Sequence, residues 1–129
     1  MLSHISLGVA VLSRSGRFYD ALLGPLGIAR VWSGPSGIGY GTPGGADRLA
    51  LFPQPDADRP LAAGPGFHLA FFAPNNDTVD RAYAAALAIG GSDAGPPGPR
   101  PRYGPGYYAA FVRDPDGHKL ELKARDSEH

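Results

Sequence analysis

The sequence contains no cysteine, which excludes disulfide bonds, thiolate metal ligands and cysteine nucleophiles. It also lacks an excess of either charge, because twelve Lys and Arg residues balance twelve Asp and Glu residues. Domains that bind nucleic acid usually carry a basic surface, so this balance argues against nucleic acid as a partner. We therefore expect a small-molecule substrate or ligand.

Long apolar segments are also missing. No run approaches the ~20 residues that are needed to cross a bilayer, and the N-terminus shows no basic segment followed by an apolar core and a cleavage site. We therefore expect no membrane partner and a cytoplasmic location. The 129 residues are enough for one domain with a core of its own.

The 19 Gly and 14 Pro residues separate short apolar segments, so we interpret them as turns. Apolar residues alternate along 4–11, which is typical of a strand with one buried face. A short helix is predicted next, capped by Ser13 or Ser15 and ended by Gly24-Pro25. Three further strands are predicted at 28–32, 34–40 and 48–52.

The same order of elements then recurs. A strand is predicted at 66–72, and a helix that is capped by Asn76 or Asp77 and stops at Gly90-Gly91 follows it. An offset of 64 residues superposes His4 on His68, and an offset of 71 superposes Ala50 on Glu121. An internal repeat with these offsets predicts two βαβββ modules.

The predicted fold class is therefore α+β. We expect one domain, 1–129, in which module 1–55 and module 66–129 are joined by a linker at about 53–66. The two modules are expected to pair and form an open, curved sheet around a cavity.

Pairing of the modules about a pseudo-twofold axis would bring His4, His68, Glu121 and Ala50 together. Two imidazoles and one carboxylate suit one divalent metal ion, such as Mn, Fe, Co, Ni or Zn. Ala50 cannot bind a metal, so it would leave a coordination position open for substrate. Each residue also has a simpler interpretation, because a single His at a strand start is often only hydrogen-bonded. Glu121 between Lys119 and Lys123 likewise resembles a solvated strand face.

The loop 100–108 precedes the strand that leads to Asp114, so it is expected to overhang the same cavity. Arg102 is a candidate for binding an anionic substrate group, and Tyr103 and Tyr108 are candidate catalytic hydrogen-bond donors. The alternative is a stiff surface connection with Arg102 in water. Trp32 and Tyr40 are candidates for the apolar wall of the substrate site, or else they belong to the core.

Three segments resemble motifs of the vicinal oxygen chelate superfamily, which includes glyoxalase I, extradiol dioxygenases, fosfomycin resistance enzymes and bleomycin resistance proteins. They are His4–Val9, His68–Phe71 and Asp114–Glu121, and the last is the most specific. The resemblance implies paired βαβββ modules, His4, His68 and Glu121 as metal ligands, and a homodimer. Glyoxalase I-like members have a second Glu where this chain has Ala50, which argues against methylglyoxal isomerisation.

Two functions follow from this pattern. The first is a divalent-metal-dependent enzyme of the glyoxalase or dioxygenase type, acting as a lyase, isomerase, transferase or dioxygenase on a small oxygen-chelating substrate. The second is a metal-free protein of the bleomycin-resistance type that sequesters a small molecule.

Overall fold

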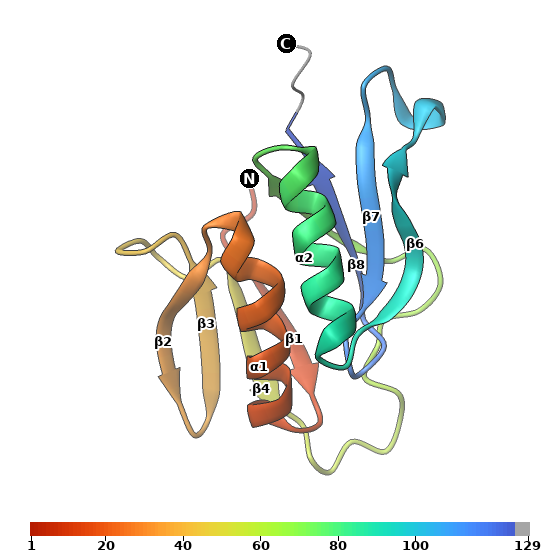
Figure 1. Cartoon of the computed structure of the whole chain (residues 1–129). Helices are drawn as coiled ribbons and strands as arrows, with labels where there is room; N and C mark the ends of the chain where they lie inside the picture. Colours follow the sequence, from red (N-terminus) through yellow and green to blue (C-terminus); the bar gives the residue numbers. More distant parts are fainter. Residues whose placement is uncertain (126–129) are drawn as a thin grey trace.

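The computed structural model describes residues 1–125, which form two βαβββ units side by side (Figure 1). The first unit contains β1 (Ile5–Val9), α1 (Leu12–Leu23), a 3-10 turn η1 (Gly24–Leu26), β2 (Ala29–Gly34), β3 (Gly37–Gly41) and β4 (Leu49–Pro53). The second contains β5 (Leu69–Ala73), α2 (Asn76–Ala88), β6 (Ser92–Pro99), a 3-10 turn η2 (Pro101–Tyr103), β7 (Tyr108–Arg113) and β8 (Lys119–Ala124).

Each unit builds one four-stranded sheet, and the two sheets have equivalent orders, β1-β4-β3-β2 and β5-β8-β7-β6. In both sheets the first strand of the unit is parallel to the last, with Ser6 opposite Ala50 and Ala70 opposite Glu121. These two pairs are related by the same offsets, 64 and 71, that the sequence repeat shows. The predicted α+β fold with two βαβββ modules is therefore confirmed.

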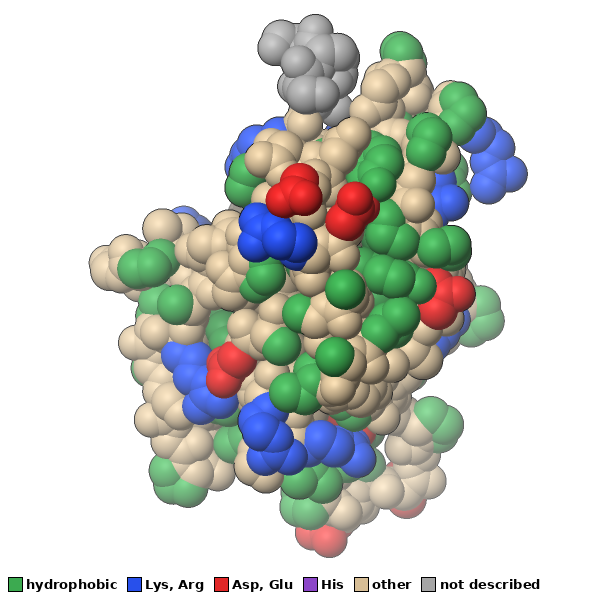
Figure 2. Space-filling model, in the orientation of Figure 1, with side chains coloured by type: hydrophobic (Ala, Val, Ile, Leu, Met, Phe, Trp, Pro, Cys, Tyr) green, Lys and Arg blue, Asp and Glu red, His purple; other side chains and the backbone are tan. Residues whose placement is uncertain are grey.

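Helices α1 and α2 lie next to each other on one side of the two sheets and pack together (Figure 1). Helix α1 presents an apolar stripe to the core, where Phe18, Tyr19, Leu22 and Leu23 are 0% exposed. Acidic and basic side chains occur in small groups of both signs on the helix-bearing face (Figure 2). Within residues 1–125, no helix combines the length and apolarity needed to cross a bilayer.

The helix starts differ from the predicted ones. Ser13 and Ser15 both lie inside α1, whose N-cap position, Val11, makes no side-chain cap. Helix α2 is capped one residue earlier than predicted, because Asn75 Oδ1 accepts the Thr78 N–H at 2.9 Å. Residues 92–99, for which the sequence predicts no strand, form β6 at the sheet edge.

The N-terminus of α1 is bound instead by Asp116, which lies in the turn between β7 and β8. Its Oδ1 accepts the Ala10 N–H at 3.2 Å and an Arg14 N–H at 3.1 Å, and its Oδ2 accepts the Ser15 hydroxyl at 3.3 Å. A carboxylate is favoured at a helix N-terminus by the helix dipole and the free N–H groups. The second module thus supplies the helix cap of the first.

The same turn makes two further contacts with the first module. Tyr19 donates its hydroxyl to Asp114 Oδ2 at 2.7 Å, and His118 Nε2 donates to the Gly8 carbonyl at 2.8 Å. Burial raises the pKa of Asp114, partly offset by the hydrogen bond from Tyr19. Burial and the neighbouring Asp114 also raise the pKa of Tyr19. These buried polar contacts hold the two modules in one arrangement.

Replacing Asp116 tests this connection. We expect D116A to lower the free energy of unfolding by about 2 kcal/mol, because the helix cap and a charge-assisted hydrogen bond are both lost. The change is measured by urea unfolding followed by circular dichroism. Asp58, whose side chain is 86% exposed, provides the control D58A, expected to change stability by less than about 0.5 kcal/mol. Equal effects of the two variants would contradict the capping role.

Candidate functional site

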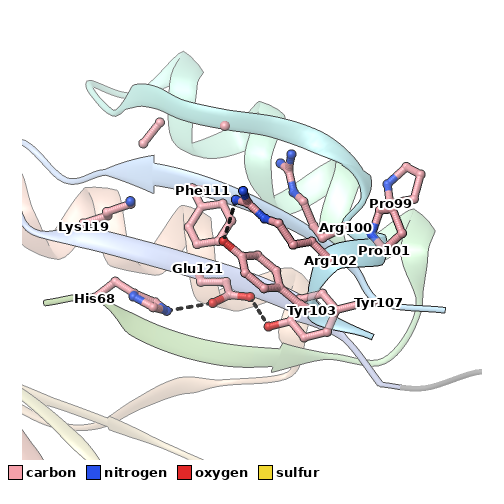
Figure 3. Close-up of a pocket in the computed structure, with 12 residues that line it drawn as sticks. His68, Pro99, Arg100, Pro101, Arg102, Tyr103, Tyr107, Phe111, Lys119 and Glu121 are labelled. Atoms are coloured by element: carbon pink, nitrogen blue, oxygen red, sulfur yellow. Dashed lines mark hydrogen bonds and ion pairs between the residues drawn. The ribbon is translucent and has the colours of Figure 1, made fainter. Parts of the chain in front are cut away.

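A cavity of about 700 Å³ lies in the second module, on the face of its sheet that is turned away from α2. Its walls come from the residue before β5 and from β6, η2, β7 and β8 (Figure 3). The lining residues are His68, Ala94, Gly95, Pro99, Arg100, Pro101, Arg102, Tyr103, Tyr107, Phe111, Lys119 and Glu121.

Glu121 stands in the middle of β8 and reaches the cavity because side chains alternate along a strand. Its neighbours Leu120 and Leu122 are 0% exposed and pack into the core, whereas Glu121 points to the opposite face. The Glu121 side chain is nevertheless only 4% exposed. A carboxylate buried to this extent requires hydrogen-bond partners.

Two side chains provide these partners (Figure 3). His68 Nε2 lies 2.9 Å from Glu121 Oε1, and the Tyr107 hydroxyl donates to Glu121 Oε2 at 2.5 Å. His68 is in reach because it immediately precedes β5, in which Ala70 pairs with Glu121. The carboxylate is thereby held in one orientation.

These donor atoms suit a divalent metal ion in kind. Imidazole nitrogen and carboxylate oxygen are common ligands of Mn, Fe, Co, Ni and Zn, and here they are already adjacent at 2.9 Å. To bind an ion, His68 Nε2 must present its lone pair, so the ion would replace the proton now shared with Glu121. Catalytic sites usually offer three protein ligands, and His68 and Glu121 supply two.

The floor and rim of the cavity combine aromatic rings with cations. The Phe111 ring packs edge-on against His68, with 5.7 Å between ring centroids. The charged groups of Arg100 and Lys119 lie 5.6 Å and 5.2 Å from the centre of the Phe111 ring. At the rim, the Tyr103 ring packs against Tyr107 at 5.4 Å.

The structure does not bring His4 to this cavity. His4 is exposed, and its Nδ1 lies 2.9 Å from the Ser3 hydroxyl. Strands β1 and β8 run in opposite directions in Figure 1, and β5 is parallel to β8. His4 and His68 therefore precede strands that start at opposite ends of the molecule. Within residues 1–125, no three His, Asp or Glu side chains are grouped to hold a metal ion.

Arg102 and Tyr103 line the cavity, whereas three other candidates lie elsewhere. The Tyr108 hydroxyl donates to Asp80 at 2.6 Å on α2, and this hydrogen bond raises the pKa of Tyr108 to about 12. Tyr40 is 1% exposed and belongs to the core. Trp32, on β2 of the first sheet, packs against Phe52 on β4, with 6.1 Å between ring centroids.

Sequence reasoning did not select Tyr107, Phe111 or Lys119 for the site. The signal was available in the turn, because counting outward from Asp114–His118 in an antiparallel hairpin pairs Phe111 with Glu121. The same count identifies Tyr107, four residues before Phe111, as lying on the same face of the chain.

The profile of the Glyoxalase/Bleomycin resistance protein/Dioxygenase superfamily matches residues 1–122. A glyoxalase/bleomycin resistance protein from Albidiferax ferrireducens T118 is 37% identical, with a TM-score of 0.81 over 97% of this chain and 98% of that one. A glyoxalase-related enzyme from Fulvimarina pelagi is 26% identical, with a TM-score of 0.73 over 97% and 88% of the two chains.

A genomically encoded fosfomycin resistance protein from Listeria monocytogenes shares the fold at 22% identity, with a TM-score of 0.70 over 99% of this chain and 95% of that one. The comparison with curated proteins gave no significant match.

The contact between Tyr107 and Glu121 can be tested by Y107F. We expect this variant to lower the free energy of unfolding by about 1 to 2 kcal/mol, because the buried carboxylate loses a hydrogen-bond donor. Tyr103, which is 52% exposed at the same rim, provides the matched control Y103F. Urea unfolding of both variants at neutral pH is the measurement. If the free energy of unfolding of Y107F equals that of the wild type, or if Y103F loses as much stability as Y107F, the hydrogen bond between Tyr107 and Glu121 does not have this role.

Proposed function

Because the chain belongs to the Glyoxalase/Bleomycin resistance protein/Dioxygenase superfamily, we propose that it is a divalent-metal-dependent enzyme acting on a small oxygen-chelating substrate. The observation that supports this most is the buried carboxylate of Glu121 at the cavity wall, with His68 Nε2 2.9 Å away. The ion would be Mn, Fe, Co, Ni or Zn. The reaction would be that of a lyase, isomerase, transferase or dioxygenase.

We propose that the third ligand is His4 from a second copy of the chain, in a homodimer. His4 is exposed, and the only hydrogen bond that it makes among residues 1–125 is to its neighbour Ser3. The first sheet also presents Trp32 and Phe52, each 38% exposed, as an aromatic pair that a partner subunit would cover. Exposed aromatic residues are enriched at protein interfaces.

His68 and Glu121 would hold the divalent ion, which would act as a Lewis acid toward a substrate oxygen. Tyr107 orients Glu121 through its hydrogen bond at 2.5 Å. Tyr103, at the rim, would donate a hydrogen bond to the substrate. Phe111 would provide an apolar surface for the part of the substrate that lies next to Glu121. The same side chains reduce the access of water to the carboxylate.

One observation favours the second candidate function, a metal-free protein that sequesters a small molecule. Both oxygens of Glu121 are hydrogen-bonded to protein groups, so the carboxylate does not require an ion for its burial. In that case the cavity of about 700 Å³ would bind its ligand without chemistry.

Metal loading distinguishes the two functions. We expect protein purified without an affinity tag to bind close to one divalent ion per chain, measured by elemental analysis after dialysis against Mn, Fe(II), Co, Ni or Zn. E121Q keeps the shape of the side chain and one of its two acceptor oxygens but is a poor ligand, and we expect at least about tenfold weaker binding for E121Q and H68A.

The control is D58N, which removes an exposed carboxylate outside the cavity. We expect it to load metal as the wild type does. A wild type that stays metal-free, or an E121Q variant that retains its ion, would contradict the enzyme assignment and support the sequestering protein.

A further inference from the structure

We propose that the cavity selects a small substrate with an anionic oxygen group, a phosphonate or carboxylate, and that Arg102 and Lys119 bind this group. This proposal rests on the proposed function, because the end of the substrate opposite the anionic group is taken to reach Glu121. It starts from a local imbalance of charge. The chain as a whole has a formal net charge of +0, but the cavity is lined by Arg100, Arg102 and Lys119 against the single carboxylate of Glu121.

Arg100 is engaged by the protein itself. Its guanidinium donates to the Pro96 carbonyl at 2.5 Å and to the Ala109 carbonyl at 3.3 Å. These two carbonyls belong to β6 and β7, so Arg100 links the two strands at the cavity wall. We assign Arg100 a positioning role, since its Nη2 donates to both of these backbone carbonyls.

Arg102 and Lys119 have different surroundings. Arg102 contacts Tyr103, with its guanidinium 5.4 Å from the ring centre and one N–H nitrogen 3.5 Å from the hydroxyl. Lys119 Nζ lies 5.2 Å from the centre of the Phe111 ring. Within the part of the chain that the structure describes, neither side chain forms a salt bridge with a carboxylate. Both cations line the cavity without a counter-ion from residues 1–125.

The positions of these two cations define where the anionic group would lie. In Figure 3, Lys119 and Arg102 stand on opposite sides of Phe111, and Phe111 pairs with Glu121 across the ladder between β7 and β8. An oxyanion over Phe111 would therefore have a cation on either side. A guanidinium and an ammonium group bind oxyanions through charge-assisted hydrogen bonds.

The electrostatics also favour an anion once the site is assembled. Glu121 offsets one of the three cations that line the cavity, and a divalent ion would add two positive charges. A neutral substrate would leave this charge uncompensated in a partly enclosed space, where charges interact more strongly than in water. An anionic ligand lowers the electrostatic free energy of the site.

The test is a titration with three probes that share a hydroxyl-bearing chain: 2-hydroxyethylphosphonate, 3-hydroxypropionate and uncharged 1,3-propanediol. Binding is followed by NMR in metal-free and in zinc-treated protein. We expect the two anions to bind at least about tenfold more tightly than the diol, with affinity falling as salt is added. Tighter binding of the phosphonate or of the carboxylate identifies which oxyanion is preferred.

Two variants test whether Arg102 and Lys119 cause the preference for anions. We expect R102Q and K119Q each to weaken binding of the anions about tenfold while leaving the diol unchanged. The matched control is R59Q, because Arg59 is 83% exposed and lies outside the cavity. Anions that bind no better than the diol, or R102Q and K119Q variants that bind them as the wild type does, would overturn the proposal.

The outcome is separable from that of the metal experiment. Zinc loading without anion preference would overturn the substrate class and leave the enzyme assignment intact. Anion binding that depends on Arg102 and Lys119 in a protein that takes up no metal would support the anionic ligand and contradict the metal-dependent enzyme.

Discussion

The turn between β7 and β8 is the constraint on which both the fold and the site depend. Asp114 Oδ1 accepts the N–H groups of Asp116 and His118, each at 2.9 Å, and Gly117 adopts a φ of 92° that favours glycine. This closed turn sets the register of the hairpin and so places Glu121 opposite Phe111. Asp116, in the same turn, binds the N-terminus of α1, and this contact joins the two modules. The turn at 114–118 therefore positions both Glu121, the candidate metal ligand, and helix α1 of the first module.

The site is organised around a buried carboxylate in a cationic setting. Burying a charge is unfavourable unless hydrogen bonds replace its hydration, and His68 and Tyr107 provide such bonds to Glu121. Lys119 and Lys123, on either side of Glu121 along β8, contact the faces of aromatic rings. This arrangement presents one fixed negative group to a cavity whose rim is positive. It suits a cation at the carboxylate and an anion over Phe111, between Arg102 and Lys119.

The sequence contained enough local signal to predict the two modules, because the repeat offsets equal the offsets between the strand ladders. It could not reveal the cap of α1, because Asp116 lies 101 residues from Ser15 in sequence. Strand β6 was hidden by its Gly and Pro content, which an edge strand tolerates. Tyr107 and Tyr108 are adjacent and point to opposite faces, so choosing Tyr107 required counting the hairpin register outward from the turn at 114–118. His4 was expected beside His68, and the side-by-side packing of the modules separates them within one chain.

Subunit complementation tests the central claim, that His68 and Glu121 of one chain bind a divalent ion together with His4 of another. H4A and E121Q are unfolded together, refolded, and assayed for bound metal beside each variant refolded alone. We predict metal at about a quarter of the wild-type level in the mixture, because half of the dimers are mixed and each of these has one intact site. Neither variant alone should load. A mixture that binds no more metal than the separate variants would contradict the account.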